Sequence, residues 1–315
     1  MASIFIQIPA YRDFELPLTV SDCIRKASGK NQLHFGIHNC ISFPEEVTLS
    51  NSTEVYAKIS CSISIAPENI GLQQSRYIAN EFYDGEDYYL QIDSHMRFVE
   101  NWDTILIEGI LKYQEMGLPK PLMTQYPPTY GYDDDLKERE IVVTDFYQCG
   151  IWFGDNVRQF EDTLIPTQMA MVMSDNCGFI SSVSGGSIFT VGEFAKIKPN
   201  PKIAFWGEEP LIAARAFTHG FDLVMPFAHS MFHLYHSQQP FEKVRRHHVW
   251  QDHPEIWAKM DAESKEEYRK IFENREIGEF ALGIERTLDE YEEFAGLDFR
   301  NRKIVGTFQN SKIKS

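Results

Sequence analysis

The stretch SIFIQIPAYRDFELPLTVSDCIRKASGKNQLHFGIHNCI, which covers residues 3–41, decides the fold class. Residues 3–11 and 33–41 are rich in β-branched and aromatic side chains, a composition that predicts two strands. The segment between them predicts a helix that Ser21 caps and that ends near Gly29. A strand, a helix and a second strand in this order are the usual opening of an α/β sheet that binds a nucleotide.

The alternation of strands and helices continues along the chain. Residues 71–85 carry a helical stripe that ends at Gly85, and a strand follows over residues 87–93. An amphipathic pattern over residues 101–117 predicts another helix, with Gly117 at its end. The remaining predicted elements are a short strand with a solvent-facing loop over residues 119–140, a strand over residues 178–194, and a turn, a helix and a strand over residues 205–227. Together these patterns predict an α/β fold.

The composition changes after Asp252, where the chain becomes polar and helical. We therefore predict one α/β domain over residues 1–252, a helical extension over residues 253–308 that packs on it, and a disordered tail over residues 309–315. Residues 236–252 are polar and basic, and this composition predicts a mobile lid over a ligand site. The alternative is a basic loop that packs on the acidic body of the protein.

Composition narrows the classes of partner. The chain has 315 residues, 43% of them hydrophobic, and a formal net charge of −16. That charge argues against a general binder of nucleic acid or of membrane surfaces, because affinity for phosphate groups comes from clustered Lys and Arg. No 18-residue apolar window occurs, so we expect no transmembrane span. Five scattered cysteines without CxxC spacing, and an amino terminus without a signal-peptide pattern, predict a cytoplasmic protein with reduced thiols.

The segment QIDSHMRF, residues 91–98, places a carboxylate and an imidazole one residue apart where a predicted strand runs into a loop. At the carboxyl edge of an α/β sheet, Asp93 and His95 can turn towards one point, where ligands of such sheets collect. Their oxygen and nitrogen atoms suit Mn²⁺, or Mg²⁺ in its place, and leave positions open for water or phosphate. The alternative is a capping aspartate beside an ordinary surface histidine.

A second group of histidines lies in FAHSMFHLYH, residues 227–236. His233 stands among apolar and aromatic neighbours, where a buried imidazole needs a polar partner. A role as third metal ligand supplies that partner. His229 competes for the role because it begins the same segment, whereas we expect His236 to face water.

Four segments carry a resemblance to a known family: IFIQIPAYRDFELPLTV, DYYLQIDSHMRFVENWD, FWGEEPLIAARAFTHGFDL and FHLY. They resemble the UDP-GlcNAc:polypeptide N-acetylglucosaminyltransferases, which include a cytoplasmic enzyme that adds GlcNAc to a hydroxyproline of a ubiquitin-ligase adaptor. More distantly, the pattern is similar to the mucin-type polypeptide GalNAc-transferases, which pair an Asp-Ser-His triplet with a Trp-Gly-Gly-Glu-Asn turn and a later metal-binding histidine. The resemblance runs from Ser3 to about Phe299.

The resemblance implies a GT-A fold, which is a Rossmann-like mixed sheet flanked by helices. It also implies a UDP-sugar donor, a divalent metal and retention of the anomeric configuration. By position, the triplet Asp93, Ser94 and His95 matches the metal- and donor-binding triplet, and His233 matches the third metal ligand. The other matching positions are Arg76 near the donor, Gly185 and Gly186 along the sugar cleft, and Trp206, Gly207, Glu208 and Glu209 in the turn that meets the transferred sugar.

The chemistry of sugar transfer agrees with these positions. Breaking the bond between a sugar and a diphosphate leaves extra negative charge on the departing UDP, which a divalent cation stabilises as a Lewis acid. Glu208 and Glu209 can hydrogen-bond sugar hydroxyls and stabilise an oxocarbenium-like centre. Alternatively, they are present because acidic residues favour the first turn of any helix. The sequence does not distinguish a covalent glycosyl-enzyme from front-face departure.

Further residues are candidates for contacts with the nucleotide. Tyr11 ends the first strand, where it can pack on uracil or simply belong to the core, and Arg12 beside it can approach phosphate. Arg76 is a candidate phosphate clamp, with a surface ion pair as the alternative. His38 and Asn39, at the end of the second strand, are additional candidates.

We therefore predict a retaining, metal-dependent glycosyltransferase that moves GlcNAc or a related sugar from a UDP-sugar to a hydroxyl group, on a hydroxylated or Ser/Thr-bearing polypeptide. A glycan, a small molecule or a modified base is an alternative acceptor, and the acidic charge argues against the last. A non-catalytic module that binds a sugar nucleotide is the other alternative. The charged carboxyl-terminal region is compatible with contacts to an acceptor or with a homo-oligomer.

Overall fold

The computed structural model describes residues 1–53, 55–132, 138–140, 146–151, 159–160, 163–166, 168–173, 178–235 and 246–306 of the chain. Two predictions concern segments outside these residues. They are the first part of the predicted lid, residues 236–245 with His236, and the tail over residues 309–315.

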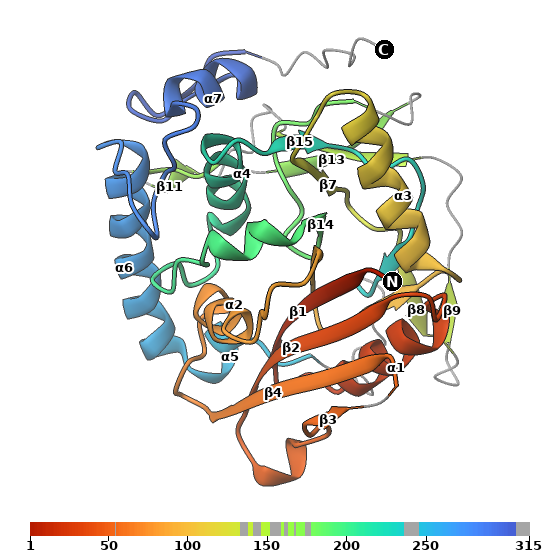
Figure 1. Cartoon of the computed structure of the whole chain (residues 1–315). Coiled ribbons are helices and arrows are strands. Elements are labelled where there is room, and N and C mark those ends of the chain that lie inside the picture. Colours follow the sequence, from red (N-terminus) through yellow and green to blue (C-terminus); the bar gives the residue numbers. More distant parts are fainter. Residues whose placement is uncertain are drawn as a thin grey trace.

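The centre of the sheet consists of two strongly apolar strands. β1 (Ser3–Tyr11) and β2 (Gln32–Ile41) pair in parallel, and nearly every residue in them is buried. Continuous apolar runs of this kind are typical of strands that helices cover on both faces. The two predicted strands and the β-α-β opening that they form are confirmed (Figure 1).

Eight strands form the main sheet in the order β15-β7-β14-β5-β1-β2-β4-β3. Within it, β5, β1, β2 and β4 run parallel to one another, and β15 runs parallel to β7. In contrast, β14 runs antiparallel to β5 and β7, and β3 runs antiparallel to β4. The six outer strands are β3 (Ser52–Thr53), β4 (Ala57–Ile65), β5 (Tyr88–Ile92), β7 (Pro121–Thr124), β14 (Ser187–Val191) and β15 (Asp222–Val224). The predicted α/β class with a mixed sheet is therefore confirmed.

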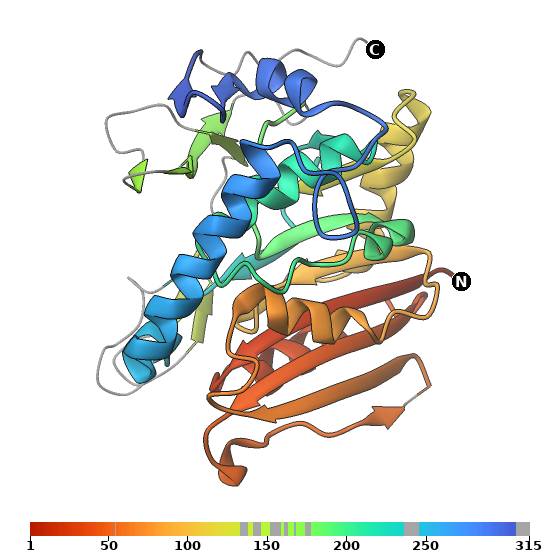
Figure 2. The same ribbon diagram turned by 90° about the vertical axis from the view of Figure 1, so that its left-hand side faces the viewer.

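Helices cover both faces of the sheet (Figure 2). α1 (Leu16–Lys26) and α3 (Trp102–Glu115) pack on one face through their buried apolar residues. α2 (Leu72–Asn80) and α4 (Glu208–Thr218) pack on the other face. None of the described helices combines the length and the hydrophobicity that a bilayer-spanning segment needs.

Short elements complete the described part of the chain. The pair of β6 and β16 matters for the site, because it lies at the carboxyl edge of the main sheet. The short elements are η1 (Pro44–Glu46), β6 (Met96–Phe98), β8 (Tyr130–Tyr132), β9 (Glu138–Glu140), β10 (Phe146–Ile151), β11 (Gln159–Phe160), β12 (Thr163–Leu164), β13 (Gln168–Met173), η2 (Gly192–Lys196), β16 (Met231–His233), β17 (Leu297–Asp298) and β18 (Lys303–Ile304).

The carboxyl-terminal segment is helical, as predicted. It contains α5 (Val249–Asp252), α6 (Pro254–Phe272) and α7 (Leu288–Ala295). Although its sequence is polar, Tyr268 and Tyr291 are buried in the same hydrophobic cluster as the apolar residues of α4. The segment therefore shares a core with the sheet, and the domain boundary at residue 252 stays a prediction.

Two helix ends differ from the prediction. α1 begins at Leu16, where Pro17 supplies a preorganised first turn, so Ser21 lies inside the helix and not at its start. α2 ends at Asn80, well before Gly85, although the apolar stripe continues to Phe82. The Tyr83 N–H donates to the Asn80 carbonyl at 3.1 Å, which turns the chain away from the helix axis.

One predicted loop and one predicted strand also differ from the structure. Within the predicted solvent-facing loop, residues 121–132 are almost entirely buried, whereas its acidic segment, residues 133–137, lies outside the described residues. The hydroxyls of Tyr130 and Tyr132 donate to the buried carboxylate of Glu15, which draws this segment onto the sheet. In residues 178–194, the strand is limited to β14, and the preceding glycines form a turn.

Candidate active site and metal centre

A cavity of about 490 Å³ opens at the carboxyl ends of β1 and β5. This is the edge at which α/β sheets bind ligands, and the volume is typical of sites for small molecules and cofactors. Its lining has three parts, which are a recess at the ends of β1 and β2, a charged centre after β5, and an aromatic wall. The residues concerned are Tyr11, Cys40 and Ile70 in the recess, Asp93, His95 and His233 in the centre, and Phe205, Trp206, Trp250 and Trp257 in the wall.

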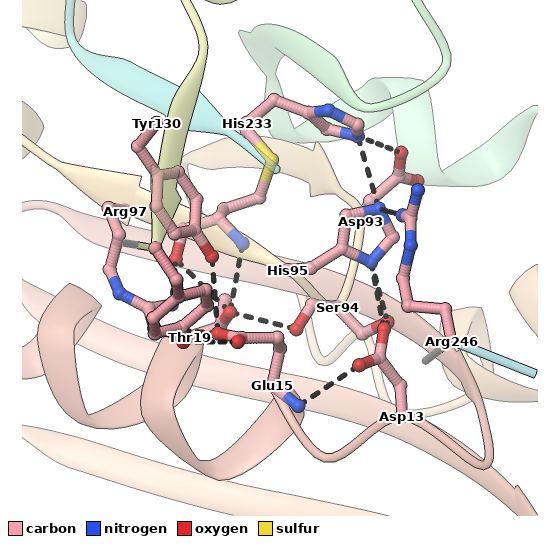
Figure 3. Close-up of polar contacts among 12 residues, drawn as sticks. Asp13, Glu15, Thr19, Asp93, Ser94, His95, Arg97, Tyr130, His233 and Arg246 are labelled. Carbon is pink, nitrogen blue, oxygen red and sulfur yellow. Dashed lines mark hydrogen bonds and ion pairs between the residues drawn. The ribbon is translucent and has the colours of Figure 1, made fainter. Parts of the chain in front are cut away.

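Asp93, His95 and His233 converge in the charged centre of the cavity (Figure 3). Asp93 follows β5, His95 precedes β6, and His233 ends β16. Because β6 and β16 pair antiparallel with Met96 opposite His233, the pairing brings the two histidines side by side. Their Nε2 atoms are 3.1 Å apart, and His233 Nε2 lies 3.3 Å from Asp93 Oδ2. Within the described part of the chain, these three residues form the one cluster able to hold a metal, and His229 is not in it.

The spacing of these atoms fits a small divalent cation. Octahedral ligands at about 2.1 Å from a metal lie about 3 Å from one another, close to both measured separations. Burial lowers the pKa of His233 to about 4, so at neutral pH the ring keeps the lone pair that a metal requires. Burial alone would raise the pKa of Asp93, but the His233 hydrogen bond and the Arg76 charge outweigh it and lower that pKa well below its usual range. An ionised carboxylate and two imidazoles suit Mn²⁺.

Arg76 is a buried organiser of the charged centre. Its side chain is only 1% exposed, so the alternative of a surface ion pair is wrong. Its Nε atom donates to Glu208 Oε1 at 2.7 Å, and its Nη2 atom donates to Asp93 Oδ1 at 3.0 Å and to the Gly185 carbonyl at 2.9 Å. One guanidinium thus ties the metal-ligand carboxylate to the start of α4.

Glu208 and Glu209 occupy the first turn of α4 and point into the cavity. Glu208 Oε1 accepts hydrogen bonds from Arg76 and, at 2.9 Å, from Gln73 Nε2. Glu209 Oε1 accepts a hydrogen bond from the Gly185 N–H at 2.9 Å. Burial raises the pKa of Glu208, and it raises the pKa of Glu209 to about 8. These contacts with residues far along the chain go beyond what a helix dipole requires. The Gly185 N–H lowers the pKa of Glu209, but burial outweighs it and favours the protonated form at neutral pH.

Gly185 and Gly186 allow the carboxylates to approach the backbone closely. A Cβ atom on Gly186 would lie 2.5 Å from Asp93 Oδ2, and one on Gly185 would lie 3.3 Å from the Glu208 carboxylate. The first distance is shorter than any real contact of a Cβ atom, so a side chain at residue 186 requires Asp93 to move. The glycine pair therefore sets the position of the metal-ligand carboxylate.

Gly186→Ala is expected to weaken Mn²⁺ binding by at least about tenfold, because the new methyl group displaces the Asp93 carboxylate from the other two ligands. Mn²⁺ affinity can be measured from the electron paramagnetic resonance signal of the free ion. Gly278→Ala is the matched control, since a Cβ atom there meets nothing within 4 Å. Equal affinities in the two variants would contradict this account of residue 186.

The structure divides the residues predicted to contact the nucleotide. Tyr11 lines the cavity, and its hydroxyl donates to Asp252 Oδ2 at 3.0 Å. Arg12 is not among the lining residues; its guanidinium binds the carboxylates of Glu46 and Asp252, each at 2.8 Å. This geometry occupies Arg12 with two partners and does not direct it towards a phosphate.

Other predicted residues also fall into two groups. His38 and Asn39 are buried in β2 and do not line the cavity, and His38 Nδ1 pairs with the Ser75 hydroxyl at 2.6 Å. Trp206 does line the cavity, where its ring stacks on that of Trp250 with centroids 6.4 Å apart. Both rings are partly exposed, so a ligand in the cavity can cover them.

The described end of the predicted lid faces the cavity. Residues 246–250 line it, and the Arg246 guanidinium contacts His95 Nε2 (Figure 3). Asp252 fixes this end of the segment through its hydrogen bonds with Tyr11 and Arg12. Mobility of the lid stays a prediction, because residues 236–245 lie outside the described residues.

Sequence reasoning missed Asp13. Its carboxylate accepts hydrogen bonds from His95 Nδ1 at 2.8 Å and from the Ser94 hydroxyl at 2.6 Å. Burial would raise the pKa of Asp13, but the His95 and Ser94 hydrogen bonds outweigh it and lower that pKa to about 2. Ser94 was predicted to contact the donor, but in the structure its hydroxyl donates a hydrogen bond to Asp13. The available signal was an acidic residue directly after the first strand, at the same edge as Asp93.

Comparison with known proteins identifies a family. The model of a family described as "Glycosyltransferase (GlcNAc)" matches residues 66–301, which is well over half of the chain. The match includes every residue placed in the charged centre of the cavity. No curated protein matches the chain.

The chain is similar to solved structures of glycosyltransferases, two of which illustrate the extent of the similarity. GalNAc-T7 with UDP, GalNAc and Mn²⁺ is 14% identical, with a TM-score of 0.46, over 75% of this chain and 44% of that one. TarS 1-349 from S. aureus in complex with UDP-GlcNAc is 10% identical, with a TM-score of 0.41, over 84% of this chain and 66% of that one. The chain thus spans less than two thirds of either protein as crystallised. Similarities of this size carry no information on catalytic residues.

Proposed function

The chain belongs to the glycosyltransferase (GlcNAc) family, and we propose that it is a metal-dependent, retaining enzyme of the GT-A type. It moves GlcNAc or a related sugar from a UDP-sugar to a hydroxyl group of a polypeptide. The observation that carries the proposal is the convergence of Asp93, His95 and His233 within one ligand-sized cavity. We place the protein in the cytoplasm, and the free thiols of Cys23, Cys40 and Cys61 agree with a reducing compartment.

The charged centre suits a sugar diphosphate. Asp93, His95 and His233 would hold Mn²⁺ or Mg²⁺, and a bound cation supplies Lewis-acid stabilisation to the diphosphate as it leaves. A protein with a net charge of −16 needs such a cation to bind a dianionic group beside ionised Asp93. With the diphosphate here, the uridine is directed to the recess beside Tyr11, and the sugar to the start of α4.

Glu208 and Glu209 are placed to act on the sugar. Both described hydrogen bonds to Glu208 go to Oε1, which leaves Oε2 for a sugar hydroxyl or for positive charge that develops at the anomeric carbon. Glu209, largely protonated at neutral pH, donates a hydrogen bond to a sugar hydroxyl or to the departing oxygen. The low exposure of Glu208 strengthens its interactions, because little water competes for them.

Removal of the metal is expected to abolish turnover. Wild-type protein incubated with Mn²⁺ should release UDP from UDP-GlcNAc, and a comparison with UDP-GalNAc and UDP-glucose should identify the preferred sugar. EDTA in excess should reduce UDP release to background, and renewed Mn²⁺ should restore it, because the diphosphate loses its counter-charge. Undiminished UDP release in EDTA would refute the proposed function.

The acceptor class requires a separate experiment with the preferred donor. We expect transfer of radiolabelled sugar to peptides that carry hydroxyproline, serine or threonine, and little transfer to glycans, small hydroxylated metabolites or hydroxymethylated bases. Nuclear magnetic resonance of the glycopeptide should show the anomeric configuration of the donor. Transfer to a non-peptide acceptor, or inversion at the anomeric carbon, would overturn the corresponding part of the proposal.

A further inference from the structure

Asp13 binds the Nδ1 edge of the His95 ring through a hydrogen bond (Figure 3). Its Oδ2 atom lies 2.8 Å from His95 Nδ1 and accepts a second hydrogen bond from Ser94 Oγ at 2.6 Å. Its Oδ1 atom accepts the Glu15 N–H at 3.0 Å. The Asp13 side chain is 6% exposed, so water does not compete for these bonds. Both carboxylate oxygens are thus committed to keep the group in one orientation.

The orientation of Asp13 has a direct consequence for the opposite side of the His95 ring. A carboxylate acceptor at Nδ1 keeps the proton of the neutral ring on that nitrogen, and the lone pair then resides on Nε2. His95 Nε2 is the atom that faces the cluster, 3.1 Å from His233 Nε2. The Arg246 guanidinium contacts the same nitrogen. Cation ligation needs the same tautomer.

We propose that Asp13 is a positioning residue that fixes the tautomer and the ring orientation of His95 for cation binding. The inference rests on the proposed function, because it presumes that the charged centre takes a divalent cation. Carboxylates that bind the second nitrogen of a metal-ligating histidine make the ring more basic and restrict its rotation. Asp13 lines the cavity, but its described hydrogen bonds go to Ser94, His95 and the Glu15 N–H and not to Asp93, His233 or the glutamates of α4.

The other histidine of the cluster lacks this support. His233 Nδ1 is buried and has no hydrogen-bond partner among the described residues. Packing against the Tyr235 ring, with centroids 4.2 Å apart, is what restrains the His233 ring. Of the two Nδ1 atoms, which point away from the cation site, only that of His95 is bound to a carboxylate among the described residues.

The backbone around Asp13 is built to deliver the carboxylate. Arg12 has a φ of 48°, in the left-handed region that residues other than glycine rarely adopt. Its N–H donates a hydrogen bond to the Cys40 carbonyl at 2.9 Å. This turn sends the chain from the end of β1 back towards the end of β5. Strain at one residue beside a functional group is typical of sites where geometry matters more than local stability.

A second anchor holds this turn independently of the Asp13 side chain. Glu15 is fully buried, and its carboxylate binds Arg97 at 2.6 Å and the Tyr130 hydroxyl at 3.1 Å. Thr19 Oγ1 donates to the Ser94 carbonyl at 2.8 Å, which fixes the other strand end. Substitution of Asp13 is therefore expected to release His95 while the turn keeps its place.

The test compares the Mn²⁺ affinity of the full-length wild-type chain with that of three variants, by electron paramagnetic resonance of free Mn²⁺. Asp13→Ala is expected to weaken binding by about 10–100-fold. Asp13→Asn retains an acceptor oxygen and should fall between Asp13→Ala and wild type. Asp22→Asn is the matched control: it changes a buried carboxylate that binds the Phe98 N–H, and should leave Mn²⁺ affinity within about twofold.

Two further readouts separate positioning from a general structural role. In ¹⁵N-histidine nuclear magnetic resonance of the metal-free chain, the His95 signals should report an Nδ1–H tautomer in wild type and a shift to Nε2–H in Asp13→Ala. In the His95→Ala background, Asp13→Ala should change Mn²⁺ affinity by less than about twofold, because its target is gone.

The outcomes distinguish failure of the proposed function from failure of the positioning role of Asp13. A wild-type chain that binds no Mn²⁺ would refute the proposed function together with this inference. Mn²⁺ affinity in Asp13→Ala equal to wild type, or an equally large loss in the His95→Ala background, would overturn the positioning role alone. Asp13→Asn keeps the test valid where Asp13→Ala does not fold.

Discussion

Asp93→Asn is expected to lower the rate of UDP release by at least about a thousandfold. The substitution is nearly isosteric, so the packing around Arg76 and Gly186 changes little. It removes the negative charge that faces the cation, and a pair of unit charges at 4 Å is worth about 4 kcal/mol at an effective dielectric of 20. A loss of that size in the transition state corresponds to about three orders of magnitude in rate. Steady-state UDP release at saturating Mn²⁺ measures the effect.

Asp289→Asn provides the control for this experiment. Asp289 is an 80% exposed carboxylate that pairs with Arg275 at 2.6 Å, far from the cavity in the fold. An exposed ion pair of this kind contributes little, so the rate should stay within about twofold of wild type. Activity of Asp93→Asn within tenfold of wild type, with its circular dichroism unchanged, would contradict the assigned role of Asp93.

Arg76→Met is expected to lower the free energy of unfolding by about 3–5 kcal/mol. Arg76 is buried, and its loss leaves the Glu208 carboxylate, itself only 7% exposed, without its cationic partner. Removing one member of a buried ion pair is costly because the remaining charge stays desolvated. The same change frees Asp93 Oδ1 and the Gly185 carbonyl, so activity should fall with stability. Urea unfolding followed by tryptophan fluorescence measures the free energy.

Two further variants test the cause of that loss. Arg302→Met removes an arginine that is 41% exposed and pairs with Glu273 at 3.0 Å, and it should cost less than about 1 kcal/mol. Adding Glu208→Gln to Arg76→Met removes the unpaired charge and should restore part of the stability. If Arg76→Met and Arg302→Met unfolded at the same urea concentration, the buried guanidinium would not hold the centre together.

Local patterns were sufficient to predict the opening of the fold. The apolar runs of β1 and β2 determine that both are central strands, since only helices on both faces can cover them. The start of α1 escaped prediction because Ser21, a good cap by type, lies inside the helix, while Pro17 marks the actual first turn. The burial of part of α6 was not predicted either, because its few apolar residues are interspersed with charged ones.

Part of the site was predictable because its residues are close in sequence or stand at strand ends. Asp93 and His95 are separated by one residue at the end of β5. The pairing of β6 with β16 places His233 beside them, and no local sequence signal predicts that pairing. Glu208 and Glu209 were identified at a helix start, but the raised pKa of Glu209 comes from burial that only the fold creates.

The contacts that orient the metal ligands were not predictable. Asp13 is one of 46 acidic residues, and no spacing relates it to His95, from which 82 positions separate it. Arg76 was predicted as a phosphate clamp near the donor, with a surface ion pair as the alternative, whereas its observed partner Glu208 comes from a distant helix. Such contacts depend on the tertiary structure, so the sequence pattern indicates the ligands but not the groups that orient them.

The most direct test of the central claim is a crystal structure of the full-length protein with UDP and Mn²⁺, with anomalous diffraction recorded to locate manganese. We predict a single anomalous peak bonded to the Asp93 carboxylate, His95 Nε2 and His233 Nε2 at about 2.0–2.6 Å, with diphosphate oxygens completing the coordination. UDP bound in the cavity without manganese at these three residues, or manganese held elsewhere, would contradict the account.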